Sequence, residues 1–356
     1  MFKRLTATAF AIAGLAMLGG NSVAAQDIKY STVSRAEFGG ALGRMMKLTG
    51  AGDPTTEVTY IKGNRVRTDE GSESSSITDF SDGMMTWLDH QTKTFYSMSI
   101  ADMTAAAQQF AAGYAADSLQ QPQAAQEEPQ VTYDFKLSTD RTGKKETIQG
   151  SHAEQVLITM EIEATEVTEE EDSVLAGTMV VLSDLWMSTD FPGYEAMQRM
   201  EAEWSKNFWA NSAGANAGGM QQANQTDPRI GAAMEKLGKE MEGLEGIALR
   251  STTHFVVVPP GEKFDRKKAL RDADKSLADD AAGAAANEAV NSAKGAISGV
   301  TGGLFGKKKP QEPKPEQSTF LRVKSEVTDV ETAALQDDLF KAPPDYTEGK
   351  LPGTGN

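Results

Sequence analysis

The stretch TTEVTYIKGNRVR at residues 55–67 decides the fold class. Val58 and Tyr60 alternate with polar neighbours, which is the side-chain period of a half-buried β-strand. Gly63 and Asn64 are typical residues for a two-residue β-hairpin turn, and the alternation resumes after them. The stretch therefore predicts two antiparallel strands joined by a tight turn.

The same pattern continues downstream of this hairpin. Polar turns at residues 81–83 and 89–93 separate short strands that we expect at 77–80, 84–88 and 94–98. Short strands at such close spacing are typical of an antiparallel meander.

Longer alternating stretches begin at Val131. Apolar residues share one face within 131–137 and again within 156–162, and residues 179–187 fit a partner strand for the second stretch. Between the last two, the acidic run 166–172 is best placed at a solvated hairpin tip. We expect these stretches to belong to the same antiparallel sheet.

Apolar residues at helical spacing predict three helices, at 101–119, 194–204 and 228–246. Two more strands are expected at 247–258 and 321–327. The sequence is therefore of the α+β class, with most of its regular structure in strands.

The first 25 residues have the pattern of a secretory signal peptide. Lys3 and Arg4 precede an apolar run over 5–18, and small residues at 23–25 predict a cut before Gln26. The apolar run is too short to span a bilayer. We therefore expect an exported, periplasmic protein.

Composition narrows the classes of function further. The formal net charge is -16, and the predicted cut removes two more positive charges, so binding to nucleic acid is not expected. The absence of cysteine excludes disulfides, thiolate metal ligands and cysteine nucleophiles. No later segment has the ~18 consecutive apolar residues of a membrane span.

We expect one domain over residues 26–346, with low-complexity insertions and a disordered tail at 347–356. The expected insertions are rich in small or polar residues, proline or glycine, and they cover residues 120–130, 207–227 and 262–317. Within the last of these, residues 285–309 carry a thin apolar stripe and three lysines. This part is interpreted either as a mobile insertion or as an interfacial helix on anionic lipid.

Seven short motifs follow one another along the chain, the first four of them close together. They are YIKGNRVR, ITD, GMMTWL and KTFY between Tyr60 and Tyr96, IQG at 148–150, LWMSTDFPG at 185–193 and FKAPPDY at 340–346. This order resembles an exported bacterial family of unknown function whose domain is similar to the LolA-type lipoprotein carriers. The resemblance implies a strongly curved antiparallel sheet, an incomplete barrel, with helices on its concave side. It brings no catalytic residue with it.

A curled sheet with helices across its mouth either buries a packed core or encloses an apolar ligand. Methionine suits the second use, because its flexible thioether adapts to irregular apolar partners such as acyl chains. The candidate ligand-cavity residues are Met84, Trp87, Phe95, Met98, Val156, Ile158, Met160, Val181 and Met187. Arg65 and Arg67 are either partners of a ligand headgroup or ordinary salt-bridged residues.

No motif in the sequence indicates catalysis or a metal site. His90, His152 and His254 show no metal-binding spacing, and the acidic tip at 169–172 lacks the spacing of a calcium loop. The sequence also contains no GxSxG elbow, phosphate-binding loop or dinucleotide fingerprint. We therefore predict a protein that is not an enzyme and that needs no cofactor.

Two functions fit these expectations. The first is a periplasmic binding protein that accommodates a lipid or a lipoprotein acyl chain inside a curved sheet. The second is a structural or interaction module of the cell envelope, with a filled core and another envelope protein as its partner.

Overall fold

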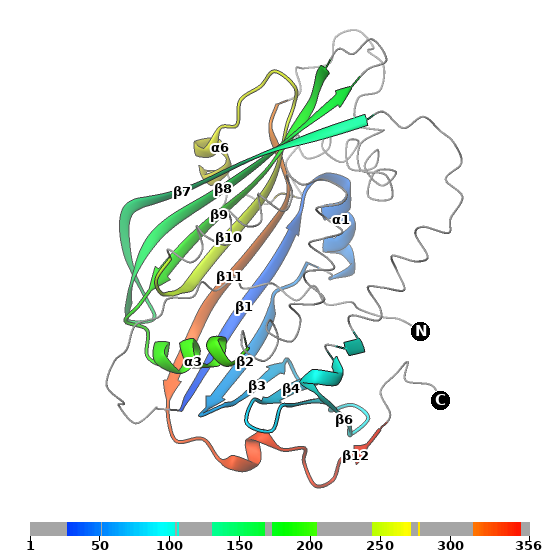
Figure 1. Cartoon of the computed structure of the whole chain (residues 1–356), viewed down its shortest axis with the longest axis vertical. Helices are drawn as coiled ribbons and strands as arrows, with labels where there is room; N and C mark the ends of the chain where they lie inside the picture. Colours follow the sequence, from blue (N-terminus) through cyan, green and yellow to red (C-terminus); the bar gives the residue numbers. More distant parts are fainter. Residues whose placement is uncertain are drawn as a thin grey trace, which may run out of the picture.

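The computed structural model of the chain describes residues 27–50, 52–103, 105–106, 130–167, 173–204, 244–271, 277 and 316–349. Their main feature is one open sheet of twelve strands in the order β12-β6-β5-β4-β3-β2-β1-β11-β10-β9-β8-β7 (Figure 1). All neighbours are antiparallel except the short pair β12 and β6, which is parallel. The expected large antiparallel sheet is confirmed.

The short strands form the predicted meander. They are β2 (Thr55–Lys62), β3 (Arg65–Glu70), β4 (Ser74–Asp79), β5 (Met84–Asp89) and β6 (Thr94–Ser99). Each pairs with the next one along the chain. At the β2–β3 turn Gly63 has φ 56°, a left-handed conformation that glycine adopts without steric cost.

The long strands carry the other half of the sheet. They are β7 (Gln130–Ile148), β8 (Ser151–Val167), β9 (Ser173–Ser188), β10 (Ile247–Val258) and β11 (Ser318–Thr332). The predicted pairing of the second and third alternating stretches is confirmed, because β8 and β9 are antiparallel neighbours. β10 has the predicted bounds, and the other four strands run beyond the stretches that the sequence indicated.

The central strand of the sheet was absent from the sequence prediction. β1 (Ile28–Phe38) lies between β2 and β11 and so joins the short-strand half to the long-strand half. The helix α1 (Gly40–Thr49) follows directly and ends at Gly50, which has φ 69°. β1 therefore begins one residue after Asp27, the first residue that the structure describes.

Few helices accompany the sheet within the described residues. The predicted helix α3 (Tyr194–Trp204) is confirmed, and α6 (Arg266–Arg271) and the 3₁₀ turn η4 (Asp337–Phe340) are added to it. A short strand, β12 (Thr347–Glu348), lies within the expected tail. None of the described helices is long and apolar enough to cross a membrane.

The two faces of the sheet carry different helices. Ala196 and Met200 of α3 pack in one cluster with Ile28 and Ile61, so we call their face of the sheet the α3 face. Across the short strands the α3 face continues through Val66, Thr78, Met85 and Met98, because each of these residues lies directly opposite the one before it. The opposite face, which Ala269 of α6 covers, is called the α6 face.

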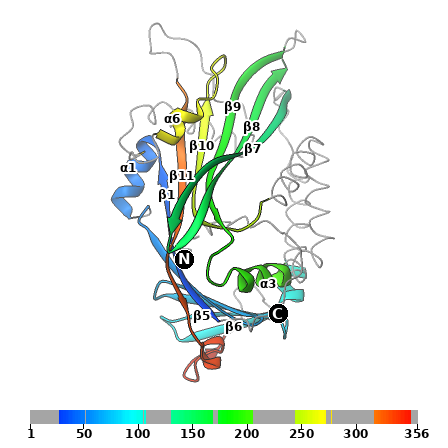
Figure 2. The ribbon, with the colours of Figure 1, turned by 90° about the vertical axis from the view of Figure 1, so that its left-hand side faces the viewer.

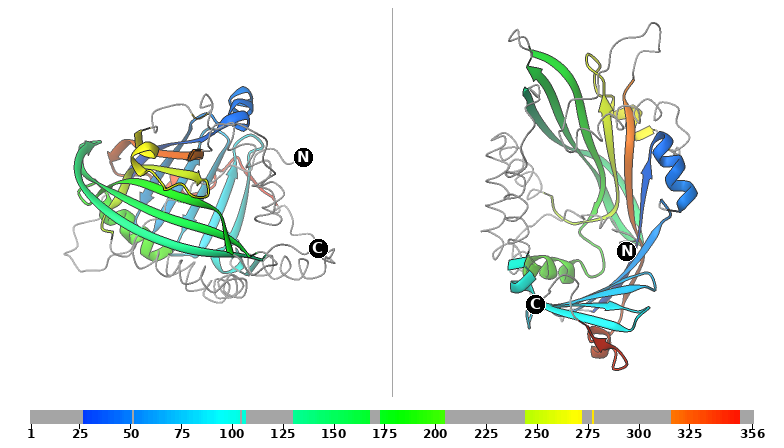
Figure 3. Two further views of the ribbon diagram at one scale, coloured as in Figure 1. Left: turned by 90° about the horizontal axis from the view of Figure 1, so that it is seen from above. Right: turned by 90° about the vertical axis from the view of Figure 1, so that its right-hand side faces the viewer.

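The sheet is curved, and it does not close into a barrel. Figures 2 and 3 show the long strands bending along their length while the short strands fan out at a different angle. The end strands β7 and β12 do not pair with each other. In the same views α1 and α6 lie on one side of the sheet and α3 on the other.

Several expectations lie outside the described residues. They are the signal peptide, the insertion 207–227, the helix at 228–246 up to residue 243, the stretch 285–309 and most of the insertion 120–130. Of the helix expected at 101–119, residues 101–103 and 105–106 are described and helical. The two ends of the insertion expected at 262–317 are described, and there Asp265 N–H donates to Gln317 Oε1 at 2.5 Å.

Candidate ligand-binding face

The α3 face of β8 and β9 is the centre of the candidate site. Val156 lies opposite Leu185, and Met160 lies opposite Val181, in the antiparallel ladder. Ile158 lies between the two pairs on the same strand. Because directly opposite residues share a face, the predicted alternation brings all five side chains together.

The register divides the nine sequence-predicted ligand residues between the two faces. Met84 and Phe95 alternate with the α3-face positions Met85 and Met98, so they lie on the α6 face. There Phe95 packs with Phe340. The seven on the α3 face are Trp87, Met98, Val156, Ile158, Met160, Val181 and Met187.

The strands β5 and β6 show why the sequence could not make this division. Both contain apolar residues in adjacent positions, such as Met84 beside Met85, so their alternation does not select one inward face. A shift of one residue in register exchanges the two faces. Only the observed pairing of Met85 with Met98 decides which residues of β5 and β6 share the α3 face.

The seven residues on the α3 face differ in how closely they are packed. Val156 and Ile158 are buried and pack with Leu244, which precedes β10. Trp87 packs near Met85 and Met200 at the short-strand end. Met160 and Val181 remain only partly buried. The packed residues therefore border a less covered apolar area on the long strands.

The two faces of the same long strands are covered unequally. On the α6 face, Val180, Leu182 and Val256 are 0 % exposed, in a cluster that includes Ala269 of α6. On the α3 face of β9, Met179 is 38 % exposed. Apolar residues on both faces of a strand are typical of a sheet with both faces covered. Beside α6 that face is therefore sealed, whereas the α3 face of β9 keeps exposed apolar surface at Met179.

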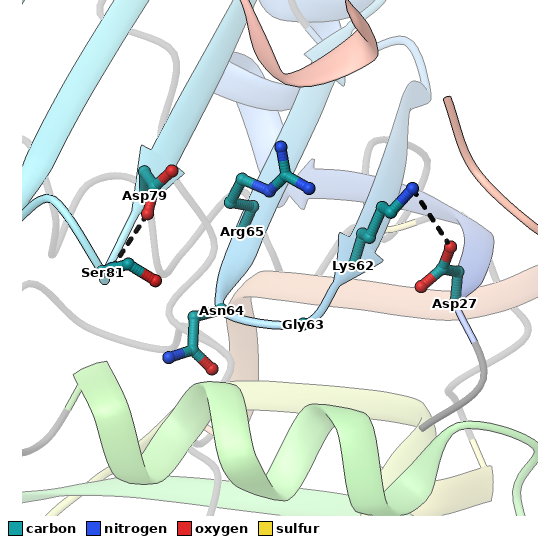
Figure 4. Close-up of a pocket in the computed structure, with 7 residues that line it drawn as sticks. All are labelled: Asp27, Lys62, Gly63, Asn64, Arg65, Asp79 and Ser81. Carbon is teal, nitrogen blue, oxygen red and sulfur yellow. Dashed lines mark hydrogen bonds and ion pairs between the residues drawn. The ribbon is translucent and has the colours of Figure 1, made fainter. Parts of the chain in front are cut away.

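A polar hollow lies at the turn ends of the short strands (Figure 4), and none of its lining residues belongs to the apolar area. It has a volume of about 560 Å³ and is open to solvent. Its lining residues come from the position before β1 and from around the β2–β3 and β4–β5 turns. They are Asp27, Lys62, Gly63, Asn64, Arg65, Asp79 and Ser81. The sequence analysis did not predict this hollow.

The cations of this hollow are already paired within the chain. Arg65 Nη2 lies 2.7 Å from Asp337 Oδ1, and Lys62 Nζ lies 3.1 Å from the same oxygen. Hydrogen bonds from Arg65 and then Lys62 lower the pKa of the Asp337 carboxyl. Arg65 also lies over the ring of Phe340, 5.1 Å from its centroid. The salt-bridged interpretation of Arg65 is therefore confirmed.

Arg67 is paired in the same way, within a polar network that fixes the C-terminal segment. Its Nε donates to Asp69 Oδ1 at 2.6 Å, and Ser75 Oγ donates to the same oxygen at 2.6 Å. His90 connects this network to the tail, with Nε2 2.6 Å from Ser75 Oγ and Nδ1 2.6 Å from the Tyr346 hydroxyl. No local sequence signal could reveal a contact over this separation.

The Ser75–His90 pair lacks the geometry of an activated nucleophile. Ser75 is 3 % exposed, and its hydroxyl also lies 2.6 Å from the Asp69 carboxylate, so it is not directed to His90 alone. At another place, His152 Nδ1 lies 2.7 Å from Asp190 Oδ2, but the Ser188 hydroxyl donates to Asp190 as well. Both arrangements tie chain segments together.

Across the described ranges, no three His, Cys, Asp or Glu side chains converge as metal ligands would. The acidic run that the sequence analysis placed at a hairpin tip lies at the β8–β9 connection, of which residues 168–172 are not described. No protein-family model matches the chain, and no curated protein has a significantly similar sequence.

Proposed function

We propose that the protein is a non-enzymatic periplasmic binding protein that holds an apolar ligand, a lipid or a lipoprotein acyl chain, on the α3 face of its curved sheet. The observation that carries the proposal is the unequal covering of the long strands. Apolar side chains at 0 % exposure on the α6 face alternate with partly exposed apolar side chains on the α3 face. An acyl chain would cover the second set as α6 covers the first.

The binding energy would come from removing hydrocarbon from water. Each buried CH₂ group contributes roughly 0.8 kcal/mol, so a contact of several methylenes is sufficient for reversible binding. Met160 and Met179 supply flexible thioether side chains, which adapt to chains of differing shape. No covalent step and no cofactor enter this mechanism.

In this proposal the α3 face is the concave face, as in the LolA-like half-barrels that the sequence resembles. The packing of Ala196 and Met200 against Ile28 and Ile61 supports this placement, because it puts a helix across the α3 face beside the candidate area. The ligand would then lie over β8 and β9, next to α3. The signal-peptide pattern of residues 1–25 supports the periplasmic location.

Native mass spectrometry of the protein purified from its own host tests the proposal directly. We expect a co-purifying lipid that is lost on delipidation, and a rise in melting temperature when lipid is added back. A clean apo mass, together with a cooperative melt that lipids do not change, would overturn it.

Two substitutions on one strand locate the ligand. Met179 on the α3 face is 38 % exposed, and Leu175 is 37 % exposed. Leu175 pairs with Thr165, whose neighbour Ala164 shares the face of Met179, so Leu175 lies on the α6 face. Met179→Glu should weaken binding of a fluorescent fatty acid at least tenfold, and Leu175→Glu should leave it unchanged. Equal affinities of the two variants would contradict the assignment of the face.

One observation favours the competing function, an interaction module of the cell envelope. On α1 the side chains of Met45 and Leu48 are 57 % and 88 % exposed, and they are spaced to share one side of the helix. Solvent-exposed apolar pairs of this kind occur at protein contact sites. Failure of lipid to bind in the experiments above would leave this function as the better interpretation.

A further inference from the structure

The two ends of the sheet are treated differently by the chain. At one end β12 adds to β6, and the Gly349 N–H donates to the Phe95 carbonyl at 2.8 Å. At the other end β7, a strand of 19 residues, pairs with β8 alone among the described strands. A long end strand offers a row of backbone donors and acceptors to another strand.

The first half of β7 is the regular part of this edge. Its pairing with β8 continues without interruption from Gln130 to Arg141, where a register shift begins. Gly143, with φ 75°, lies inside the irregular stretch. A partner strand can therefore follow β7 as far as Asp140 and no further.

Asp134 marks the outward side of this edge. Its Oδ1 accepts a hydrogen bond at 3.0 Å from the backbone N–H of Phe135. A side chain thus accepts a bond from this backbone donor. A second strand would supply a carbonyl to that donor and release the carboxylate for another contact.

We propose that a second copy of this chain pairs with β7 in antiparallel orientation along Gln130–Asp140, with a two-fold axis at Phe135. The proposal does not depend on the proposed function. In this register each Phe135 faces the other, and Asp134 of each copy lies opposite Lys136 of the other. Aromatic pairs and opposite charges at directly facing positions both stabilise antiparallel strands.

Neighbouring registers are less favourable. An axis at 134 or at 136 places two aspartates or two lysines directly opposite each other. An axis at 137 places Asp134 opposite Asp140. An axis at 138 pairs Lys136 with Asp140 but puts Phe135 against Arg141, where the irregular stretch begins. Only the axis at Phe135 joins both charges and both aromatic rings within the regular part of β7.

Charge reversal tests the pairing. Sedimentation of the mature protein should give twice the mass of one chain at high concentration. Lys136→Asp and Asp134→Lys should each weaken dimerisation at least tenfold, and the double swap should restore it. Among the described residues Lys136 bonds Glu163 at 2.7 Å, and its own side chain is 56 % exposed, so its replacement should lower the melting temperature only slightly. Lys145→Asp, beyond the irregular stretch, is the matched control and should dimerise normally.

Cross-linking fixes the register. The chain has no cysteine, so introduced thiols are the only ones present. Thr132→Cys combined with Ser138→Cys places one thiol of each copy opposite one of the other, within disulfide reach, and oxidation should give a covalent dimer. Neither single variant should cross-link. A monomer at every concentration, or dimers from Ser138→Cys alone, would overturn the proposal.

Discussion

At the scale of single residues, a buried ionic group in the α6 face is the most unusual feature. Arg322 and His254 are both 0 % exposed and lie opposite each other on β11 and β10. Arg322 Nη1 lies 3.0 Å from Glu37 Oε2, and its Nε lies 3.4 Å from His254 Nδ1. Burial, with the charges of Arg322 and Lys324, lowers the pKa of His254 to about 4. His254 is therefore neutral at neutral pH.

His254 should make the fold sensitive to mild acid. A histidine with a folded pKa of about 4 and an unfolded pKa near 6.5 contributes its full stability above pH 6.5, and the contribution is lost as pH falls through 4. When the loss is complete, this group has lowered the free energy of unfolding by about 3 kcal/mol. We expect urea unfolding of His254→Gln to lose less stability than wild type between pH 7 and 4.5. Parallel pH profiles of the two proteins would contradict this.

Asp190 is a second residue whose charge ties segments together. Hydrogen bonds from the Ser188 hydroxyl and from the His152 ring and backbone N–H lower its pKa to about 2. The stabilisation is present above pH 4 and is lost as pH falls through 2. Because its side chain is 47 % exposed, we expect Asp190→Ala to cost only about 1 kcal/mol at pH 7. Asp190→Asn, which keeps an acceptor, should cost less by the same urea measurement.

At the scale of elements, the connection into β10 depends on a glycine. Gly246 has φ 102°, and a Cβ there would lie 2.6 Å from the Ser188 carbonyl oxygen of the neighbouring strand. That oxygen belongs to the backbone and cannot move aside, so strain adds to the cost of the conformation.

Gly246→Ala should therefore destabilise the protein by more than about 2 kcal/mol. Gly261, with φ 83° and open space around it, is the matched control. Gly261→Ala should cost only about 1 kcal/mol, because it adds the cost of the left-handed conformation without a backbone clash. Thermal unfolding of both variants makes the comparison, and equal losses would show that the contact with Ser188 does not matter.

Elements whose partners are close in sequence could be predicted, and those with distant partners could not. The β2–β3 hairpin follows from Gly63 and from local alternation. β1 does not, because its alternate residues on the α3 face include Thr32, Ser34 and Ala36, which give no apolar period. Its partner β11 lies about 290 residues away in sequence, as in the pair Ser34 and Ser325.

The same limit applies to the candidate site: contacts between neighbouring strands could be predicted, and contacts between distant segments could not. The residues of β8 and β9 were grouped correctly on one face, because in a long strand the alternation itself shows which residues point the same way. The pairing of Arg65 with Asp337 and of His90 with Tyr346 was not predictable, because the partners come together only when the C-terminal segment folds back.

At the scale of the whole molecule, the C-terminal segment after β11 completes the fold by covering the α6 face of the short strands. Phe340 is 6 % exposed and packs with Ile77 and Leu88. Lys62 donates to the carbonyl of Leu335, and Arg67 Nη1 donates to that of Leu339 at 2.9 Å. The short meander thus takes one of its two covering layers from a segment that is last in the chain.

Removing this segment should therefore destabilise the whole sheet. A chain that ends at Thr332 loses the Phe340 cluster and also uncovers the edge of β6, so we expect a much lower melting temperature and aggregation on heating. Phe340→Ala alone should cost about 3 kcal/mol, because it empties a buried aromatic site. A chain that ends at Lys350 keeps β12 and should melt like the full-length protein. If the chain that ends at Thr332 melted normally, the C-terminal segment would be an addition to a sheet that is stable without it.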